Sequence, residues 1–212
     1  MTDNYSCRSI LNQIDQETSN LRAMLNQFKH GPGPAKNAAY VNILIWSKML
    51  IYHVQNLKKC NEQKFNIWFK KYRLEIYGKP KDEAKKLGMP DKIVSYFVAE
   101  RDSLEHEGKL NTTTRTSISH LNLPADLFKY GGPKPPNATN MFMDGNGVGW
   151  FIKMPDGSTA KVYVVIPEEQ MKTDIIPTNL PKELEGQSVE QLLTYYINYL
   201  DNMVKDAIKE FG

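Results

Sequence analysis

Apolar residues recur at every third or fourth position along several stretches of the chain, a spacing that predicts amphipathic helices. The first stretch covers residues 5–29, and its apolar positions are Ile10, Ile14, Leu21, Leu25 and Phe28. Gly and Pro at positions 31–34 cannot continue a helix, so a turn is expected there. A second helix is predicted from about residue 35 to residue 61, with the apolar set Tyr40, Val41, Leu44, Ile45, Met49, Tyr52 and Leu57.

Three more helices follow from the same pattern and from capping residues. Residues 62–77 form one helix in this interpretation, and residues 92–107 form the next, with Asp91 as its N-cap and Gly108 at its C-terminal end. The last helix is predicted over residues 188–211, where Ser188 and Gln191 have the spacing of a capping box.

The segment between the last two helices has a different composition. Residues 109–140 contain a Thr/Ser run and a Pro/Gly segment, which are typical of loops. Val148–Met154 and Ala160–Ile166 are rich in β-forming residues and flank Pro155–Thr159, which predicts a β-hairpin. A further loop is expected around Pro167, Pro177 and Pro181.

These patterns predict a mainly α fold. Residues 1–108 and 188–212 form a bundle of four to five helices, and residues 109–187 form a loop and β-hairpin insertion before the last helix. A bundle is the simplest arrangement that buries all of the apolar stripes.

Composition agrees with a globular protein and excludes several classes. The 212 residues are 41% hydrophobic and 24% charged, which is typical of a folded domain and not of disordered, collagen-like or disulfide-rich chains. The first residues lack the pattern of a signal peptide, and the apolar stretch from Val41 to Tyr52 is too short to span a bilayer. Cys7 and Cys60 are interpreted as buried or idle thiols, which fits a reducing compartment. We therefore expect a soluble, cytoplasmic protein that makes no membrane contact.

Basic residues are concentrated in one part of the chain. From Lys48 to Lys86 there are eleven Lys or Arg residues and four acidic residues, with aromatic residues between them, whereas the whole chain has a net charge of +3. Basic residues interleaved with aromatic ones are one indication of nucleic-acid binding, and the alternative is a helix with a solvated lysine face and an aromatic core face. The RNA-binding candidates in this segment are Lys58, Lys59, Lys70, Lys71 and Arg73.

A second candidate site lies at the end of the predicted helix 92–107. Arg101, Asp102 and His106 combine a fixed cation, a carboxylate and a titratable imidazole within six positions. Asp102 and His106 are four residues apart and share a helix face. Such a set suits phosphodiester cleavage without a metal, because one group transfers protons while the cation stabilises the charge on the phosphoryl oxygens.

This motif resembles that of the HEPN superfamily of helical bundles, in which Arg is followed by a polar residue, three further residues and His. The resemblance implies a metal-independent endoribonuclease of a toxin or phage-defence type, active as a homodimer whose two motifs line one cleft. It implies that His106 is the acid/base, that Arg101 binds the scissile phosphate and that Asp102 has a supporting role. Some relatives carry a Tyr two residues beyond the His, which an antitoxin modifies, whereas this chain has Gly108 there.

Other motifs carry less weight. Arg115 and His120 repeat the Arg–His spacing in a stretch that reads as loop or strand, and they are further RNA-binding candidates. Residues 145–149 are rich in glycine but lack the remainder of a phosphate-binding loop, and no group of ligands predicts zinc. We expect no metal and no cofactor. The alternative to a nuclease is a non-catalytic helical binding protein whose partner the sequence does not identify. An antitoxin or another protein is a further candidate partner.

Overall fold

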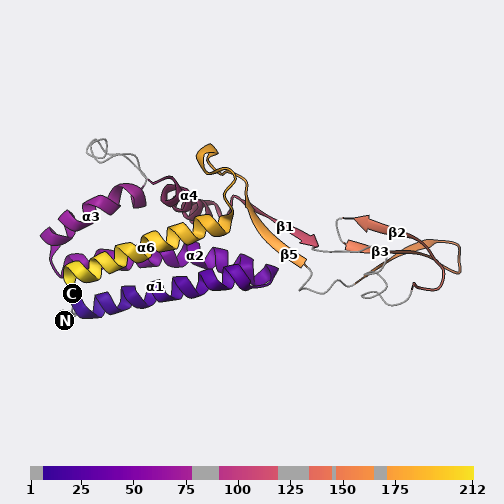
Figure 1. Ribbon diagram of the computed structural model, residues 1–212, viewed down its shortest axis with the longest axis horizontal. Coiled ribbons are helices and arrows are strands. Elements are labelled where there is room, and N and C mark those ends of the chain that lie inside the picture. The colour runs from indigo at the N-terminus through magenta and orange to yellow at the C-terminus, as the bar shows by residue number, and fades with distance from the viewer. Residues whose placement is uncertain (1–6, 78–90, 119–133, 145–146, 165–170) are drawn as a thin grey trace. The chain divides into compact units, whose positions relative to one another are not determined.

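A computed structural model describes residues 7–77, 91–118, 134–144, 147–164 and 171–212 (Figure 1). The chain divides into a helical unit, Met1–Thr114 with Ile175–Gly212, and a sheet unit, Arg115–Asp174. The α-helices of the helical unit are α1 (Cys7–His30), α2 (Gly33–Val54), α3 (Glu62–Tyr77), α4 (Lys92–Glu107) and α6 (Val189–Phe211). Short 3-10 helices lie at Gln55–Lys59 (η1) and Lys182–Leu184 (η4). The described residues are thus mainly helical, as predicted, with more β-structure than a simple bundle has.

The core of the helical unit lies where α1 packs along α2 and α6. Its buried side chains come from the predicted stripes of α1 and α6, for example Ile14, Leu21, Leu192 and Leu200, each 0% exposed. The capping box at the start of α6 is confirmed, because the Ser188 hydroxyl accepts from the Gln191 backbone N–H while the Gln191 side chain accepts from the Ser188 N–H.

The second predicted helix differs from the structure in its end and in its buried face. It changes to the tighter η1 at Gln55 and ends before residue 61. Three residues of its predicted apolar set, Ile45, Met49 and Tyr52, are exposed. The helix buries Tyr40 and Leu44 of the predicted set together with Ile43, Ser47, Leu50, Ile51 and Val54, which were not in that set. Because apolar residues surround almost the whole helix, its sequence does not define a single buried face.

The interpretation of the two cysteines as idle thiols is wrong. Cys7 and Cys60 form a disulfide, with their Cα atoms 5.5 Å apart. The bond joins the first turn of α1 to the segment between η1 and α3, 53 residues later in the chain. No spacing rule applies to a single pair of cysteines, so the sequence alone did not reveal this pairing.

Five strands are described, two of them in a sheet of their own. β1 (Thr112–Ile118) pairs with β5 (Met171–Pro177), and both strands cross the boundary between the two units. We predicted a loop around Pro177, whereas the stretch that begins at Arg115 was left open as loop or strand. β1 consists of Thr and Ser residues with one Arg and a final Ile. Since β-branched residues favour extended backbone, this segment suits a strand once a partner strand is present.

The sheet unit contains the antiparallel sheet β2–β3–β4, made of Ala138–Asp144, Gly147–Lys153 and Thr159–Tyr163. The predicted hairpin is confirmed as β3 and β4. β2 was not predicted as a strand. One face of this sheet buries Ala138, Val148 and Trp150. No described helix is long and apolar enough to cross a membrane.

Candidate functional site

The last two turns of α4 carry the Arg–Asp–His motif, as the sequence predicted. Asp91 starts this helix because its carboxylate accepts hydrogen bonds from the backbone N–H groups of Ile93 and Val94, at 2.9 and 3.0 Å. Gly108 ends it with a left-handed φ of 63°, a conformation that glycine adopts without steric cost. The motif therefore lies in regular helix that is defined at both ends.

Arg101 and Asp102 contact each other. The Arg101 Nε and Nη2 atoms donate to Asp102 Oδ1 at 3.2 and 3.0 Å. The Arg101 side chain is 8% exposed and the Asp102 side chain 51% exposed, so the guanidinium lies inside the bundle and its partner lies at the surface. The Arg101 charge also reaches Tyr77 and Tyr196, where it opposes the rise in pKa that burial causes.

His106 lies in the last turn of α4 and is exposed. Among the described residues, no hydrogen bond or ion pair of its imidazole is found, and Asp102 directs its contacts to Arg101. The neighbouring Glu105 pairs with Lys48 of α2. The structure thus brings Arg101 and Asp102 together and leaves His106 outside this contact.

A buried polar cluster next to the motif was missed by the sequence analysis. Glu100 is 2% exposed, and its carboxylate accepts from the backbone and side-chain nitrogens of Asn111 at 3.3 and 2.9 Å. Burial raises the pKa of Tyr40 and Tyr96, and the nearby charge of Glu100 raises both further. Glu100 precedes Arg101 directly, and helical periodicity places it on the inner face of α4. The sequence analysis did not use this periodicity to predict that Glu100 is buried.

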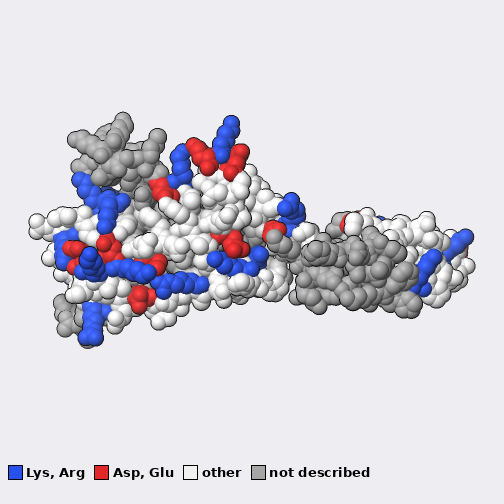
Figure 2. All heavy atoms as spheres, viewed as in Figure 1, with Lys and Arg blue, Asp and Glu red and all other residues white. Residues whose placement is uncertain are grey.

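Residues 48–77 of the basic segment lie in the described part of the chain, and their buried aromatic residues form the core face that the second interpretation names. The aromatic side chains Phe65, Trp68 and Phe69 are buried in the core. The candidate RNA-binding residues of this segment are exposed, which both interpretations require: Lys58, Lys59, Lys70, Lys71 and Arg73. Several basic residues here have partners, because Lys71 pairs with Asp206 and Lys64 with Glu210. Figure 2 shows basic side chains interleaved with acidic ones over the helical unit.

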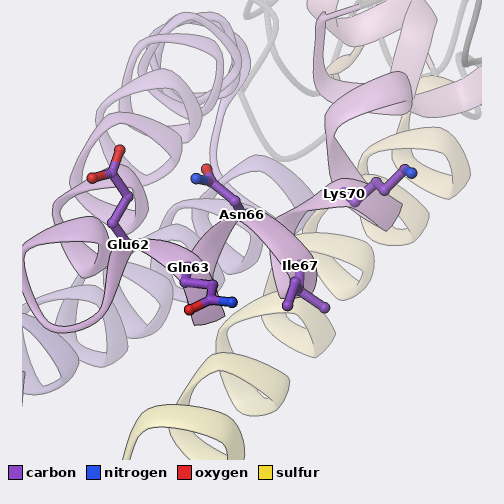
Figure 3. Close-up of a pocket in the computed structure, with 5 residues that line it drawn as sticks. All are labelled: Glu62, Gln63, Asn66, Ile67 and Lys70. Carbon is purple, nitrogen blue, oxygen red and sulfur yellow. The ribbon is translucent and has the colours of Figure 1, made fainter.

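A shallow hollow lies on the outer side of α3 (Figure 3). It is lined by Glu62, Gln63, Asn66, Ile67 and Lys70, all from this one helix. Ile67 is 72% exposed. Lys70 is the one candidate site residue that lines it, and the Arg101–Asp102 pair does not.

The remaining candidates are only partly described. Arg115 lies exposed on β1, whereas His120 falls outside the described residues. Gly145 and Asn146 of the glycine-rich segment also lie outside them, and the following Gly147 begins β3. Within the described ranges, no group of His, Cys, Asp and Glu side chains is arranged to hold a metal ion.

An aromatic cluster on the three-stranded sheet was also missed. The ring centroid of Phe142 lies 4.9 Å from that of Phe151 and 5.0 Å from that of Tyr163. The Lys161 ammonium lies 4.9 Å from the centroid of Phe142. Phe142 lies on β2, which was not predicted as a strand, so the sequence pattern did not place these rings together.

The comparisons with known proteins add no relative. No family model, no curated protein and no solved structure matches this chain.

Proposed function

We propose that this protein is a non-catalytic binding protein. The observation that carries the proposal is the contact between Arg101 and Asp102. Catalysis by the motif requires a guanidinium that meets the phosphate and a carboxylate that orients the imidazole. Here the guanidinium is buried and donates twice to Asp102. An arginine held in this way supports the packing of α4 better than it supports phosphate binding.

A metal-independent endoribonuclease is the second candidate, and the exposure of His106 favours it. An imidazole at the surface is accessible to a 2′-hydroxyl group. Two copies of the chain would be needed to place one His106 beside the basic group of another, as the family resemblance implies.

One experiment separates the two candidates. Purified protein is incubated with total RNA in EDTA, and wild type is compared with His106→Ala and with a control, His30→Ala, which alters an exposed histidine at the end of α1. A binding protein leaves RNA intact in all three samples. Cleavage by wild type and His30→Ala, absent in His106→Ala and yielding cyclic phosphate ends, would overturn our proposal and establish the nuclease.

A further inference from the structure

The three-stranded sheet has aromatic side chains on the face opposite its buried core. Since side chains alternate along a strand, Val148 and Trp150 of β3 point to the core face and Phe151 points to the other. Polar residues normally occupy the second face of such a sheet. Phe142 and Phe151 are instead half-buried there, and Tyr163 is 41% exposed.

The register places these rings side by side across the strands. Phe142 is opposite Gly149, and Gly149 is opposite Tyr163, so the two rings flank a residue without a side chain. Phe151 is opposite Lys161 in the adjacent row. A Cβ atom on Gly149 would lie 2.9 Å from Cζ of Phe142, which shows that this ring covers the glycine.

A purely structural role accounts for only part of this cluster. Aromatic residues often cover a glycine on a neighbouring strand, and this explains Phe142. It does not explain why Phe151 and Tyr163 also lie on this face, because neither is needed to cover Gly149.

The charged groups on the same face indicate what the rings contact. Lys161 is held beside the rings by an ion pair with Asp144 at 2.6 Å, and the same carboxylate accepts from the Tyr163 hydroxyl at 3.2 Å. The alternation along β3 places Lys153 on this face too, where it is exposed. Two ammonium groups thus accompany one carboxylate among the described side chains of the face, which favours an anionic ligand.

We propose that this face, formed by Phe142, Phe151, Tyr163, Lys153 and Lys161, binds single-stranded nucleic acid. Bases stack on the accessible parts of aromatic rings and the phosphates between them contact lysines, a combination that tolerates different sequences. A duplex offers its bases to one another instead, so it binds this face more weakly. The inference rests on the proposed binding function and names its partner.

The test uses the whole 212-residue chain and fluorescently labelled ten-nucleotide oligo(U) and oligo(dT), with binding followed by anisotropy in EDTA. We expect Phe151→Leu and Tyr163→Leu each to weaken binding about tenfold, because leucine keeps apolar volume but removes the stacking face. Tyr163→Phe should bind like wild type. The matched control is Val162→Ala, which alters the same strand on the opposite face and should leave the affinity unchanged.

Cross-linking of a 4-thiouridine oligonucleotide to the wild-type protein gives a readout that needs no variant. Mass spectrometry should locate the cross-link on β2, β3 or β4. A cross-link confined to α3, equal affinity of the leucine variants and wild type, duplex bound as tightly as single strand, or binding of a proline-rich peptide in place of the oligonucleotide would each overturn the inference.

A denaturing gel of the oligonucleotide after each titration separates the two proposals. Cleaved oligonucleotide would contradict the non-catalytic function, and the ring variants would then be measured in a His106→Ala background. Intact oligonucleotide with no loss of affinity in the ring variants would overturn the sheet-face assignment alone.

Discussion

The indole Nε1 of Trp68 donates a hydrogen bond to Oδ2 of Asp206 at 2.9 Å, and this contact joins α3 to α6. The same oxygen accepts from the Tyr72 hydroxyl at 2.8 Å and from Lys71. Because α3 contributes all three donors, one carboxylate fixes the position of this helix against the C-terminal helix. The Lys71 ammonium is the main cause that holds the pKa of Asp206 below its ordinary value of 3.8.

We predict that Asp206→Ala lowers the free energy of unfolding by about 1–3 kcal/mol, because three donors lose a charged acceptor and the Trp68 indole is largely buried. Urea unfolding followed by circular dichroism measures this loss. Asp15→Ala is the control, since Asp15 is exposed on α1 and its carboxylate makes no described hydrogen bond. Equal losses in the two variants would show that the contact contributes nothing specific.

The effect of Asp206 depends on pH. A pKa that is lower in the folded than in the unfolded chain means that the ionised carboxylate stabilises the fold above pH 4. This stabilisation disappears as the pH falls through the folded pKa. The difference in stability between wild type and Asp206→Ala should therefore be constant from pH 5 to 7 and shrink below pH 4. A difference that grows in acid would have the wrong sign.

The Cys7–Cys60 disulfide should stabilise the helical unit under oxidising conditions. Its loop spans 53 residues, for which loop-closure entropy gives about 4 kcal/mol. We expect dithiothreitol to lower the unfolding midpoint of wild type and to leave Cys7→Ser unchanged, as measured by urea titration. Mass spectrometry after alkylation checks the bond directly, and two alkylated cysteines in the unreduced protein would refute it.

The sequence pattern predicted helix bounds and buried faces most accurately where a helix has one apolar stripe and clear capping residues. The last helix combines both in Ser188, Gln191 and its leucines, and its predicted range differs from the structure only at the first residue. The second helix has apolar residues on nearly all sides, so the sequence pattern could not distinguish the exposed Ile45 and Met49 from core residues. Burial of such a helix is decided by its neighbours, which local patterns do not contain.

The candidate site shows the same limit. The sequence located Arg101 and His106 on one helix end, but it placed Asp102 beside the wrong partner. Spacing allows Asp102 to reach His106, but in the structure the guanidinium of the adjacent Arg101 donates hydrogen bonds to the Asp102 carboxylate instead. The pairing of Glu100 with Asn111 depends on the turn that follows Gly108, and that turn is not encoded in helical spacing.

Buried tyrosines, Tyr40 and Tyr96 among them, should titrate abnormally. Burial is the main cause that raises the pKa of Tyr40 and Tyr96 above the ordinary 10.0. Because the neutral phenols are favoured in the folded chain, stability falls as the pH rises above 10. We expect absorbance at 295 nm at pH 11 to show fewer ionised tyrosines in native protein than in urea, where an ordinary pKa of 10.0 leaves about 10 of the 11 ionised. Tyr40→Phe should remove one of the late-ionising groups. Ionisation of every tyrosine in the native protein at that pH would contradict the burial.

Arg101 should be structural. We predict that Arg101→Ala destabilises the protein by about 2 kcal/mol or more, since the side chain is buried and its removal leaves a void and an unpaired Asp102. The control is Arg73→Ala, which changes an exposed arginine of α3 and should alter the unfolding free energy by less than about 0.5 kcal/mol. Thermal unfolding of both variants measures the difference. A fully stable Arg101→Ala protein would indicate that this arginine is retained for another purpose, such as contact with phosphate.

Gly149 should be indispensable to the sheet unit and irrelevant to the helical unit. A Cβ atom at this position would clash with the carbonyl oxygen of Val162 and lie 2.9 Å from Cα of Tyr163. Both are backbone atoms, so the clash can be relieved only if the β4 backbone moves away from β3. Gly149→Ala should therefore separate β3 from β4. Limited proteolysis should cut residues 147–163 in this variant and spare them in wild type. The helical circular dichroism signal should remain, because the two units have separate cores.

Gly157→Ala is the control, because it alters the hairpin turn, where a Cβ atom would meet nothing within 4 Å. Its φ of 84° favours glycine, so we expect a mild loss of stability in this variant too. If Gly149→Ala also removed the helical signal, the two units would fold as one.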